Sequence, residues 1–140
     1  MKVGSANTPP NAEKKINKKP RIAVDSAFKK TRSGLKIYVE HFGEGKALQK
    51  GDKVKVHYEG WLAEDYTMFD SSRKKRKPFE FVLGENQVIP GWEEAMSGVK
   101  EGSKIQLIVP PELAYGQQGF DNIKIPPNAT LIFQVEVLRA

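Results

Sequence analysis

One short stretch, residues 88–96, carries the only clear helix signal in this chain of 140 residues, and the chain after residue 34 otherwise reads as strands and turns. Pro90 suits the first helical position, because its missing N–H would have no partner there. Two glutamates come next in the first turn, where negative charge suits the helix dipole, and Gly98 ends the helix. A helix of about two turns is not stable alone in water. We therefore expect a sheet to enclose it, with Trp92 as its anchor and as the floor of a pocket.

Alternation of apolar and polar residues predicts the strands of that sheet. The alternating stretches are residues 35–39, 53–58, 79–83, 105–109 and 131–138. Glycine and proline, which favour turns, separate them. The pattern predicts an α+β domain in which an antiparallel sheet of about five strands curls around one short α-helix.

The first part of the chain, residues 1–33, is basic and has few apolar residues and no sustained period, which predicts a disordered tail. One brief helical turn fits within residues 23–28. Up to residue 36, ten Lys and Arg face two acidic residues, giving +8, whereas the whole chain carries +6. A solvated linker is the favoured interpretation, because aromatic residues to stack on bases are not interleaved with the lysines, and Phe28 is the only one in this segment. Weak binding of polyanions such as RNA is the alternative. The predicted domain then covers residues 34–140.

Several kinds of chemistry are excluded by what the sequence lacks. Without cysteine it has no disulfide, thiolate nucleophile or cysteine-ligated metal, and it has neither a phosphate-binding glycine loop nor a Gly-x-Ser-x-Gly elbow. His41 and His57 are separated by a turn region and do not make a metal site, and His57 is expected on the outer face of its strand. We expect no cofactor and no metal.

Location is predicted from two further absences. No apolar run approaches the roughly 18 residues of a membrane span. Residues 1–11 lack the apolar core of a signal peptide, which predicts a cytoplasmic protein. A chain from which a signal had been removed would look the same and would be exported.

Aromatic residues near turns are the main candidates for a functional site. They are Tyr58, Phe69, Phe79, Trp92, Tyr115, Phe120 and Phe133. Each one alone is more typical of a core. Together with Asp70, they are typical of a concave apolar ligand pocket with a few placed polar groups.

Seven motifs, in order along residues 35–140, resemble those of the FKBP-type peptidyl-prolyl cis-trans isomerases. They are Gly51-Asp52, Val56-His57-Tyr58-Glu59-Gly60, Phe69-Asp70-Ser71-Ser72, Pro78-Phe79-Glu80-Phe81, Val88-Ile89-Pro90-Gly91-Trp92-Glu93-Glu94, Ala114-Tyr115-Gly116 and Ile125-Pro126-Pro127-Asn128-Ala129-Thr130-Leu131. The resemblance implies the family fold, with the active site between helix and sheet, and an enzyme that acts on proline-containing polypeptides. It also implies macrolide ligands such as tacrolimus and rapamycin. The tail is too short for the long helical dimerisation domain of some relatives, so we expect a monomer.

Positions in the family pattern imply the roles of individual residues. Trp92 becomes the pocket floor. The implied walls, rim and interior are Tyr58, Phe79, Val88, Ile89, Phe133, Phe69, Asp70, Tyr115, Phe120 and Ile125, with the Ile89 N–H and the Gln87 carbonyl as substrate contacts. Among these, Tyr58, Asp70, Tyr115 and Phe133 are the implied catalytic residues.

The sequence departs from the family pattern near this pocket. Lys75 stands where some members carry arginine, and Phe120 stands where histidine is often seen. The loop of residues 119–125 is one residue longer than in the smallest members. The basic run of residues 73–77 is interpreted as a solvated loop, with partner binding as the alternative.

Isomerisation would explain the absence of a catalytic triad. Rotation about an Xaa-Pro bond breaks no covalent bond, but loss of amide resonance sets a barrier of roughly 18–20 kcal/mol. A dry aromatic pocket favours the less dipolar twisted amide. In this hypothesis Trp92 and Phe133 hold the prolyl ring, the Ile89 N–H and the Tyr115 hydroxyl orient the peptide, and Asp70 either acts on the carbonyl carbon or organises the rim. A binding module delivered by its basic tail, and a family member without useful activity, are the alternatives.

Overall fold

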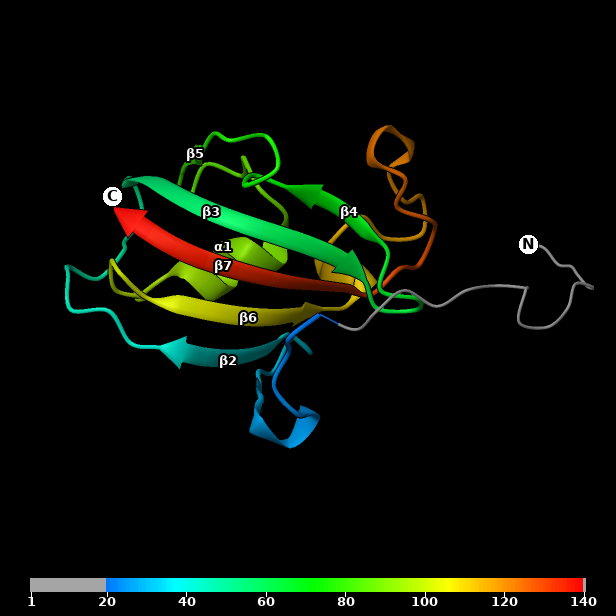
Figure 1. Cartoon of the computed structure of the whole chain (residues 1–140), viewed down its shortest axis with the longest axis horizontal. Coiled ribbons are helices and arrows are strands. Elements are labelled where there is room, and N and C mark those ends of the chain that lie inside the picture. The colour runs from blue at the N-terminus through cyan, green and yellow to red at the C-terminus, as the bar shows by residue number, and fades with distance from the viewer. Residues whose placement is uncertain (1–19, 140) are drawn as a thin grey trace, which may run out of the picture.

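A seven-stranded antiparallel sheet curled around one short helix dominates the computed structural model, which describes residues 20–139 (Figure 1). The strands are β1 (Lys29–Lys30), β2 (Lys36–His41), β3 (Lys53–Leu62), β4 (Met68–Ser71), β5 (Phe79–Val82), β6 (Lys104–Val109) and β7 (Leu131–Arg139), and the helix is α1 (Pro90–Met96). In this part of the chain, 3-10 turns lie at Asp25–Ala27, Pro111–Leu113 and Asp121–Ile123. The predicted α+β architecture is confirmed.

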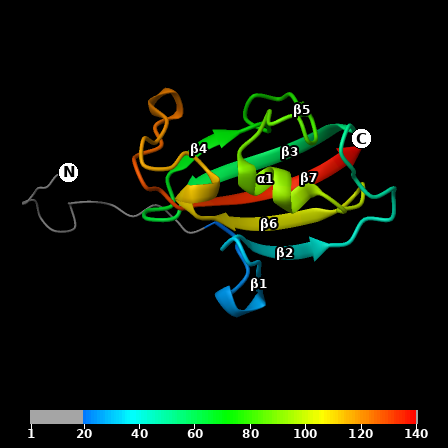
Figure 2. The same cartoon turned by 180° about the vertical axis from the view of Figure 1, so that it is seen from behind.

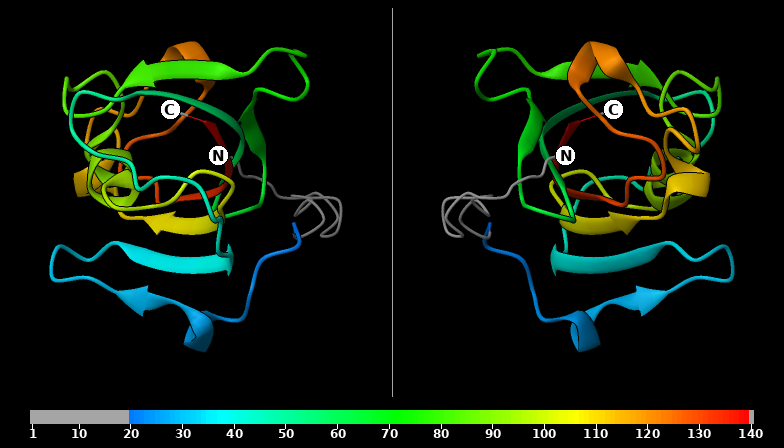
Figure 3. Two further views of the ribbon diagram at one scale, coloured as in Figure 1. Left: turned by 90° about the vertical axis from the view of Figure 1, so that its left-hand side faces the viewer. Right: turned by 90° about the vertical axis from the view of Figure 1, so that its right-hand side faces the viewer.

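The sheet is ordered β1-β2-β6-β7-β3-β4, and β5 also pairs with β3. The long strand β3 therefore has β7 along one edge, and β5 and then β4 along the other. Seen end-on, the sheet bends into an open half-barrel with α1 on its concave side (Figure 3). From behind, α1 lies across the face formed by β3, β7 and β6 (Figure 2).

Alternation along the strands sends one set of side chains into the core. The inner residues of β7 are Leu131, Phe133, Val135 and Val137, and all are at most 4% exposed. Partners from β3 and β6 pack with them and with Trp92 and Met96 of α1. The strand predicted from alternation over residues 131–138 is confirmed, because burial on one side enforces the period of two.

Five strands match the five predicted stretches, and two more were missed. Strand β1 has only two residues and both are exposed, so it leaves no hydrophobic pattern. Strand β4 has four residues that do not alternate in polarity, and it pairs with the second half of β3. Short edge strands of this kind are specified by their neighbours more than by their own sequence.

The prediction of a disordered segment over residues 1–33 is wrong for residues 20–33, while residues 1–19 lie outside the described part. The Ala23 N–H donates to the side chain of Gln106 at 2.8 Å, and Gln134 donates to the Arg21 carbonyl. Asp25 forms an ion pair with Lys36 at 3.1 Å. Polar contacts hold this segment against the outer side of the sheet, and a search for apolar patterns cannot detect them.

The predicted helix forms as expected, with Pro90 as its first residue. Ile89 is the N-cap and Pro90 occupies the first turn. Glu93 accepts hydrogen bonds from the N–H groups of Gly84 and Asn86 at 2.8 and 3.0 Å, which ties the β5–α1 loop to the helix. Gly98 has a φ of +88°, a conformation that favours glycine after a helix. Within residues 20–139, no helix has the length and apolar character needed to cross a membrane.

Candidate functional site

A cavity of about 230 Å³ lies between α1 and the concave face of the sheet. Its lining is rich in aromatic rings and carries one carboxylate. The lining residues are Tyr58, Phe69, Asp70, Phe79, Gln87, Val88, Ile89, Trp92, Tyr115, Phe120, Ile123 and Phe133. They come from four strands, the loop before α1, α1 itself and the loop before β7. This composition is typical of a pocket for an apolar group that is oriented by a few polar atoms.

Trp92 lies at the centre of an aromatic cluster. Its ring is 5.1 Å from Tyr58, 5.3 Å from Phe133 and 6.2 Å from Phe79 between centroids, and each pair meets edge to face. Such pairs contribute about 0.5–1.5 kcal/mol each beyond the area they bury. The indole is only 4% exposed, and its N–H has no hydrogen-bond partner in residues 20–139. Packing alone therefore fixes the indole, which presents a rigid floor.

Gly60 permits the aromatic wall on the sheet side. Phe69 and Phe133 meet edge to face at 5.6 Å. A Cβ on Gly60 would lie 2.6 Å from the Phe69 ring and 3.0 Å from the Phe133 ring. A glycine in the middle of β3 is needed because two rings cross that point of the strand.

The carboxylate of Asp70 is fixed at the rim by three donors. The Tyr58 hydroxyl donates to one oxygen at 2.5 Å. Lys75 lies 2.9 Å from the other oxygen, which also accepts the Ser71 N–H at 2.9 Å. The Asp70 side chain is 16% exposed and that of Lys75 is 64% exposed. The lysine thus occupies the place expected of an arginine, but with a single, solvated contact instead of a planar fork.

Burial and the nearby carboxylate keep both pocket tyrosines protonated. Burial raises the pKa of Tyr58 above its usual range, and the hydrogen bond to Asp70 raises that pKa further. Burial also raises the pKa of Tyr115, with a smaller contribution from the charge of Asp70. The Tyr58 hydroxyl donates a hydrogen bond to Asp70, whereas the Tyr115 hydroxyl has no such acceptor in the described part of the chain.

Tyr58→Phe is expected to weaken the dependence of stability on alkaline pH. The unfolded chain releases the tyrosine proton near its ordinary pKa of 10.0, while the folded chain retains it. The contribution of this proton to stability is therefore complete below that pH and decreases as the pH rises. Between about pH 9 and about pH 11, the free energy of unfolding of the unsubstituted protein should fall by up to about 1.4 kcal/mol per pH unit more than that of the variant. Urea unfolding at each pH measures this, and parallel curves would contradict it.

Two backbone groups near the first turn of α1 remain without partners. The Ile89 carbonyl accepts the N–H groups of Trp92 and Glu93 at 3.0 and 3.2 Å, but the Ile89 N–H and the Gln87 carbonyl make no hydrogen bond within residues 20–139. The Gln87 side chain is engaged instead with the Val82 N–H at 2.8 Å. One free donor and one free acceptor at a cavity wall can together orient a peptide.

Comparisons with known proteins agree on one family. The profile of FKBP-type peptidyl-prolyl cis-trans isomerases matches residues 44–138. The chain belongs to this family. An FK506-binding protein of Neisseria meningitidis serogroup B is 50% identical over 106 residues, covering 76% of this chain and 95% of the relative. The peptidyl-prolyl cis-trans isomerase Fkbp12 of Drosophila melanogaster is 47% identical over 98 residues, covering 69% of this chain and 89% of the relative.

A solved structure extends the FKBP likeness to the fold. The crystal structure of FkpA from Escherichia coli matches with a TM-score of 0.75 and 43% sequence identity. The match covers 82% of this chain and 52% of the FkpA chain. The resemblance deduced from the sequence motifs is thereby confirmed.

Eleven of the twelve side chains predicted for the FKBP pocket line the cavity, and Ile125 does not. Ile125 is 2% exposed and forms an isolated bridge with Phe120. Ile123 lines the cavity in its place. Lys124 adopts a left-handed conformation with φ of 59° at the end of the preceding 3-10 turn, which rotates Ile125 inward. The longer loop was visible in the sequence, but its effect on register was not.

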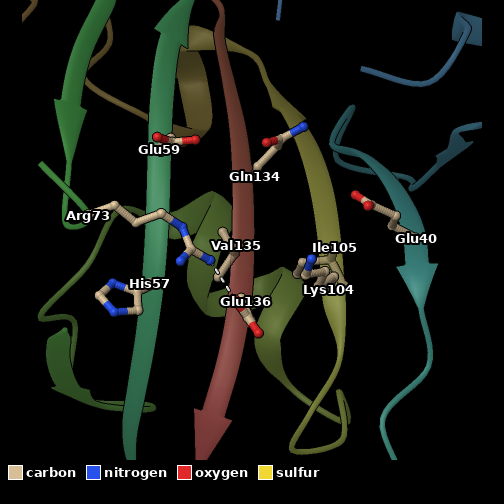
Figure 4. A pocket seen from close by; sticks show the side chains of 9 residues that line it. All are labelled: Glu40, His57, Glu59, Arg73, Lys104, Ile105, Gln134, Val135 and Glu136. Atoms are coloured by element: carbon tan, nitrogen blue, oxygen red, sulfur yellow. Dashed lines mark hydrogen bonds and ion pairs between the residues drawn. The ribbon is translucent and has the colours of Figure 1, made fainter. Parts of the chain in front are cut away.

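A larger hollow of about 380 Å³ lies on the opposite, outer face of the sheet. Arg73 crosses over β3 there and forms an ion pair with Glu136 of β7 at 2.5 Å (Figure 4). His57 also points to this outer face, as predicted, and is 2.9 Å from the Ser72 hydroxyl. Within the described residues, no three His, Asp or Glu side chains gather as they would around a metal ion. These contacts fix the start of the basic loop, residues 73–77, which reaches the cavity rim through Lys75.

Proposed function

We propose that the cavity above Trp92 is the site where this FKBP-type isomerase binds a prolyl segment and catalyses rotation about the Xaa-Pro bond. The observation that carries the proposal is the union of an aromatic enclosure with a free peptide donor at Ile89. A prolyl ring is apolar and compact, and a floor and walls of edge-on rings suit it. The neighbouring N–H orients the peptide so that its amide carbonyl lies in the cavity.

Catalysis in such a site is differential stabilisation of the twisted amide. The planar Xaa-Pro amide has a large dipole that water solvates well, and twisting reduces that dipole. Transfer into a pocket that excludes water therefore costs the planar form more than the twisted form. No proton, nucleophile or metal is required, because no covalent bond is made or broken.

Asp70 is proposed to act as a fixed charge at the rim. Its oxygens accept hydrogen bonds from Tyr58, Lys75 and Ser71, so its orientation is set before substrate binds. A preorganised charge of this kind stabilises partial positive charge at the carbonyl carbon of the twisted amide. The Tyr115 hydroxyl, which donates no hydrogen bond within residues 20–139, is the proposed donor to the flanking peptide.

Macrolide binding is proposed at the same cavity. The Neisseria relative is named for binding FK506, and the aromatic enclosure found here supports the same ligand class. Tacrolimus and rapamycin should therefore compete with prolyl peptides. Lys75 and Phe120 alter the rim, so the change is expected in affinity and not in the place of binding.

A monomeric state and a cytoplasmic location stay predictions, and weak polyanion binding by the tail stays the alternative to a solvated linker. Most of the basic residues of that tail lie in residues 1–19, outside the described structure. Sedimentation, cell fractionation and binding of RNA at low salt test them in turn.

Proline-limited refolding tests the proposed function. The chain should accelerate, in proportion to its concentration, the slow phase of a substrate protein whose folding waits for a prolyl bond. Tacrolimus in excess should remove the acceleration. An unaltered slow phase at equimolar chain would contradict catalysis, and acceleration that persists with tacrolimus bound would contradict the shared site.

A further inference from the structure

A second hollow adjoins the prolyl cavity across a shared wall. Tyr58 and Phe79 line both spaces. The second hollow has a volume of about 530 Å³, and three lysines contribute to its lining, namely Lys55, Lys75 and Lys77. We call it the lysine groove. A polypeptide held above Trp92 can enter it without leaving the surface.

Positive charge outweighs negative charge in the lysine groove. Lys55 is paired with Glu80 at 3.2 Å, and Lys75 with Asp70 at 2.9 Å. Lys77 has no ion-pair partner within residues 20–139. The groove therefore retains a net positive charge, which attracts an anionic group.

The backbone of the basic loop is fixed before any ligand arrives. Its first residue is tied to β7 by the Arg73–Glu136 ion pair (Figure 4). The Ser72 hydroxyl accepts the Tyr58 N–H at 2.7 Å, and the Ser72 carbonyl accepts the Lys77 N–H at 3.2 Å. Lys77 thus lies on a closed loop, which lowers the ordering cost of binding.

We propose that the lysine groove selects polypeptide substrates with an acidic side chain about two residues from the proline. This rests on the proposed function of the adjoining cavity. The Tyr58 and Phe79 rings lie 5.1 and 6.2 Å from Trp92. Each extended residue spans about 3.3–3.6 Å, so about two residues carry the chain past this wall. The groove has no aromatic ring beyond the two that it shares with the cavity, which disfavours a nucleic acid.

Matched peptides test the selection. Each pair differs only in Glu or Gln, placed at the second or third position on either side of the proline, and exchange NMR measures cis-trans turnover without an auxiliary protease. At about 20 mM salt, kcat/KM at one position should be about 3 times higher for the Glu peptide than for its Gln partner. This Glu:Gln ratio should approach unity at about 1 M salt. Lys77→Gln should bring that ratio close to unity at low salt, and Lys77→Glu should invert it.

Lys74→Gln is the control, because Lys74 is exposed on the same loop and does not line the groove. It should leave the ratio unchanged. If the Glu:Gln ratio is near unity at every position, or if Lys74→Gln lowers the ratio as much as Lys77→Gln does, the lysine groove does not select acidic substrates. Turnover of the Gln peptides in the same experiment would still support the isomerase site. Inhibition by a single-stranded oligonucleotide that Lys77→Gln abolishes would instead assign the groove to nucleic acid and overturn the proposal. Failure to turn over any peptide would overturn the proposed function itself.

Discussion

Trp92→Leu is expected to lower kcat/KM for a prolyl peptide by about 10- to 100-fold while the protein still folds. Leucine fills the volume in part, but it removes the flat floor and the edge contacts with Tyr58, Phe79 and Phe133. Loss of stability should be about 1–3 kcal/mol, below the usual cost of removing a buried tryptophan, because the unpartnered indole N–H disappears as well. Urea unfolding and exchange NMR measure the two effects separately.

Met96→Ala is the control that distinguishes loss of the pocket floor in Trp92→Leu from a general loss of core packing. Met96 is fully buried on the same helix and does not line the cavity. Its truncation should destabilise the chain by about 2–5 kcal/mol and leave kcat/KM per folded molecule unchanged. If Trp92→Leu unfolds the chain outright, or if both variants lose activity equally, Trp92 is a core residue only.

Phe133→Ala should combine the largest loss of stability with a large loss of activity. Phe133 is 4% exposed, and its ring contacts Trp92 on one side and Phe69 on the other. Its truncation is expected to cost about 3–5 kcal/mol. The wall beside the prolyl ring opens to water, so kcat/KM should fall by at least about 100-fold. The activity of Phe133→Ala should be measured at a temperature at which circular dichroism shows that the variant is folded.

Leu131→Ala provides the matched control for that change. Leu131 is fully buried on the same strand and faces the same way, but it does not line the cavity. It should lose about 2–5 kcal/mol of stability and keep its activity. Activity of folded Phe133→Ala equal to that of Leu131→Ala would remove Phe133 from the site.

The sequence was most informative where burial on one face imposes a period. Strand β7 and helix α1, with Trp92 as its anchor, were predicted because alternation and a proline at the first helical turn are local signals. The aromatic side chains were predicted as a group because motifs in family order place them. Their mutual geometry, including the need for Gly60 beneath two rings, is a property of the sheet and required the structure.

Long-range polar contacts account for most of what was missed. The ordering of residues 20–33 depends on side-chain amides of Gln106 and Gln134, which lie far along the chain. Ile123 lines the cavity in place of the predicted Ile125 because of the left-handed turn at Lys124. The anchoring of the basic loop depends on the Arg73–Glu136 ion pair across the outer face of the sheet. None of these has a periodic signal.

The rate of cis-trans exchange in a short Xaa-Pro peptide tests the central claim most directly. Exchange NMR with the full chain should show strong acceleration, and folded Tyr58→Ala, Asp70→Ala and Phe133→Ala variants should each lose most of it. No acceleration by the original chain, or full activity in all three variants, would contradict the claim that the cavity above Trp92 is the catalytic site.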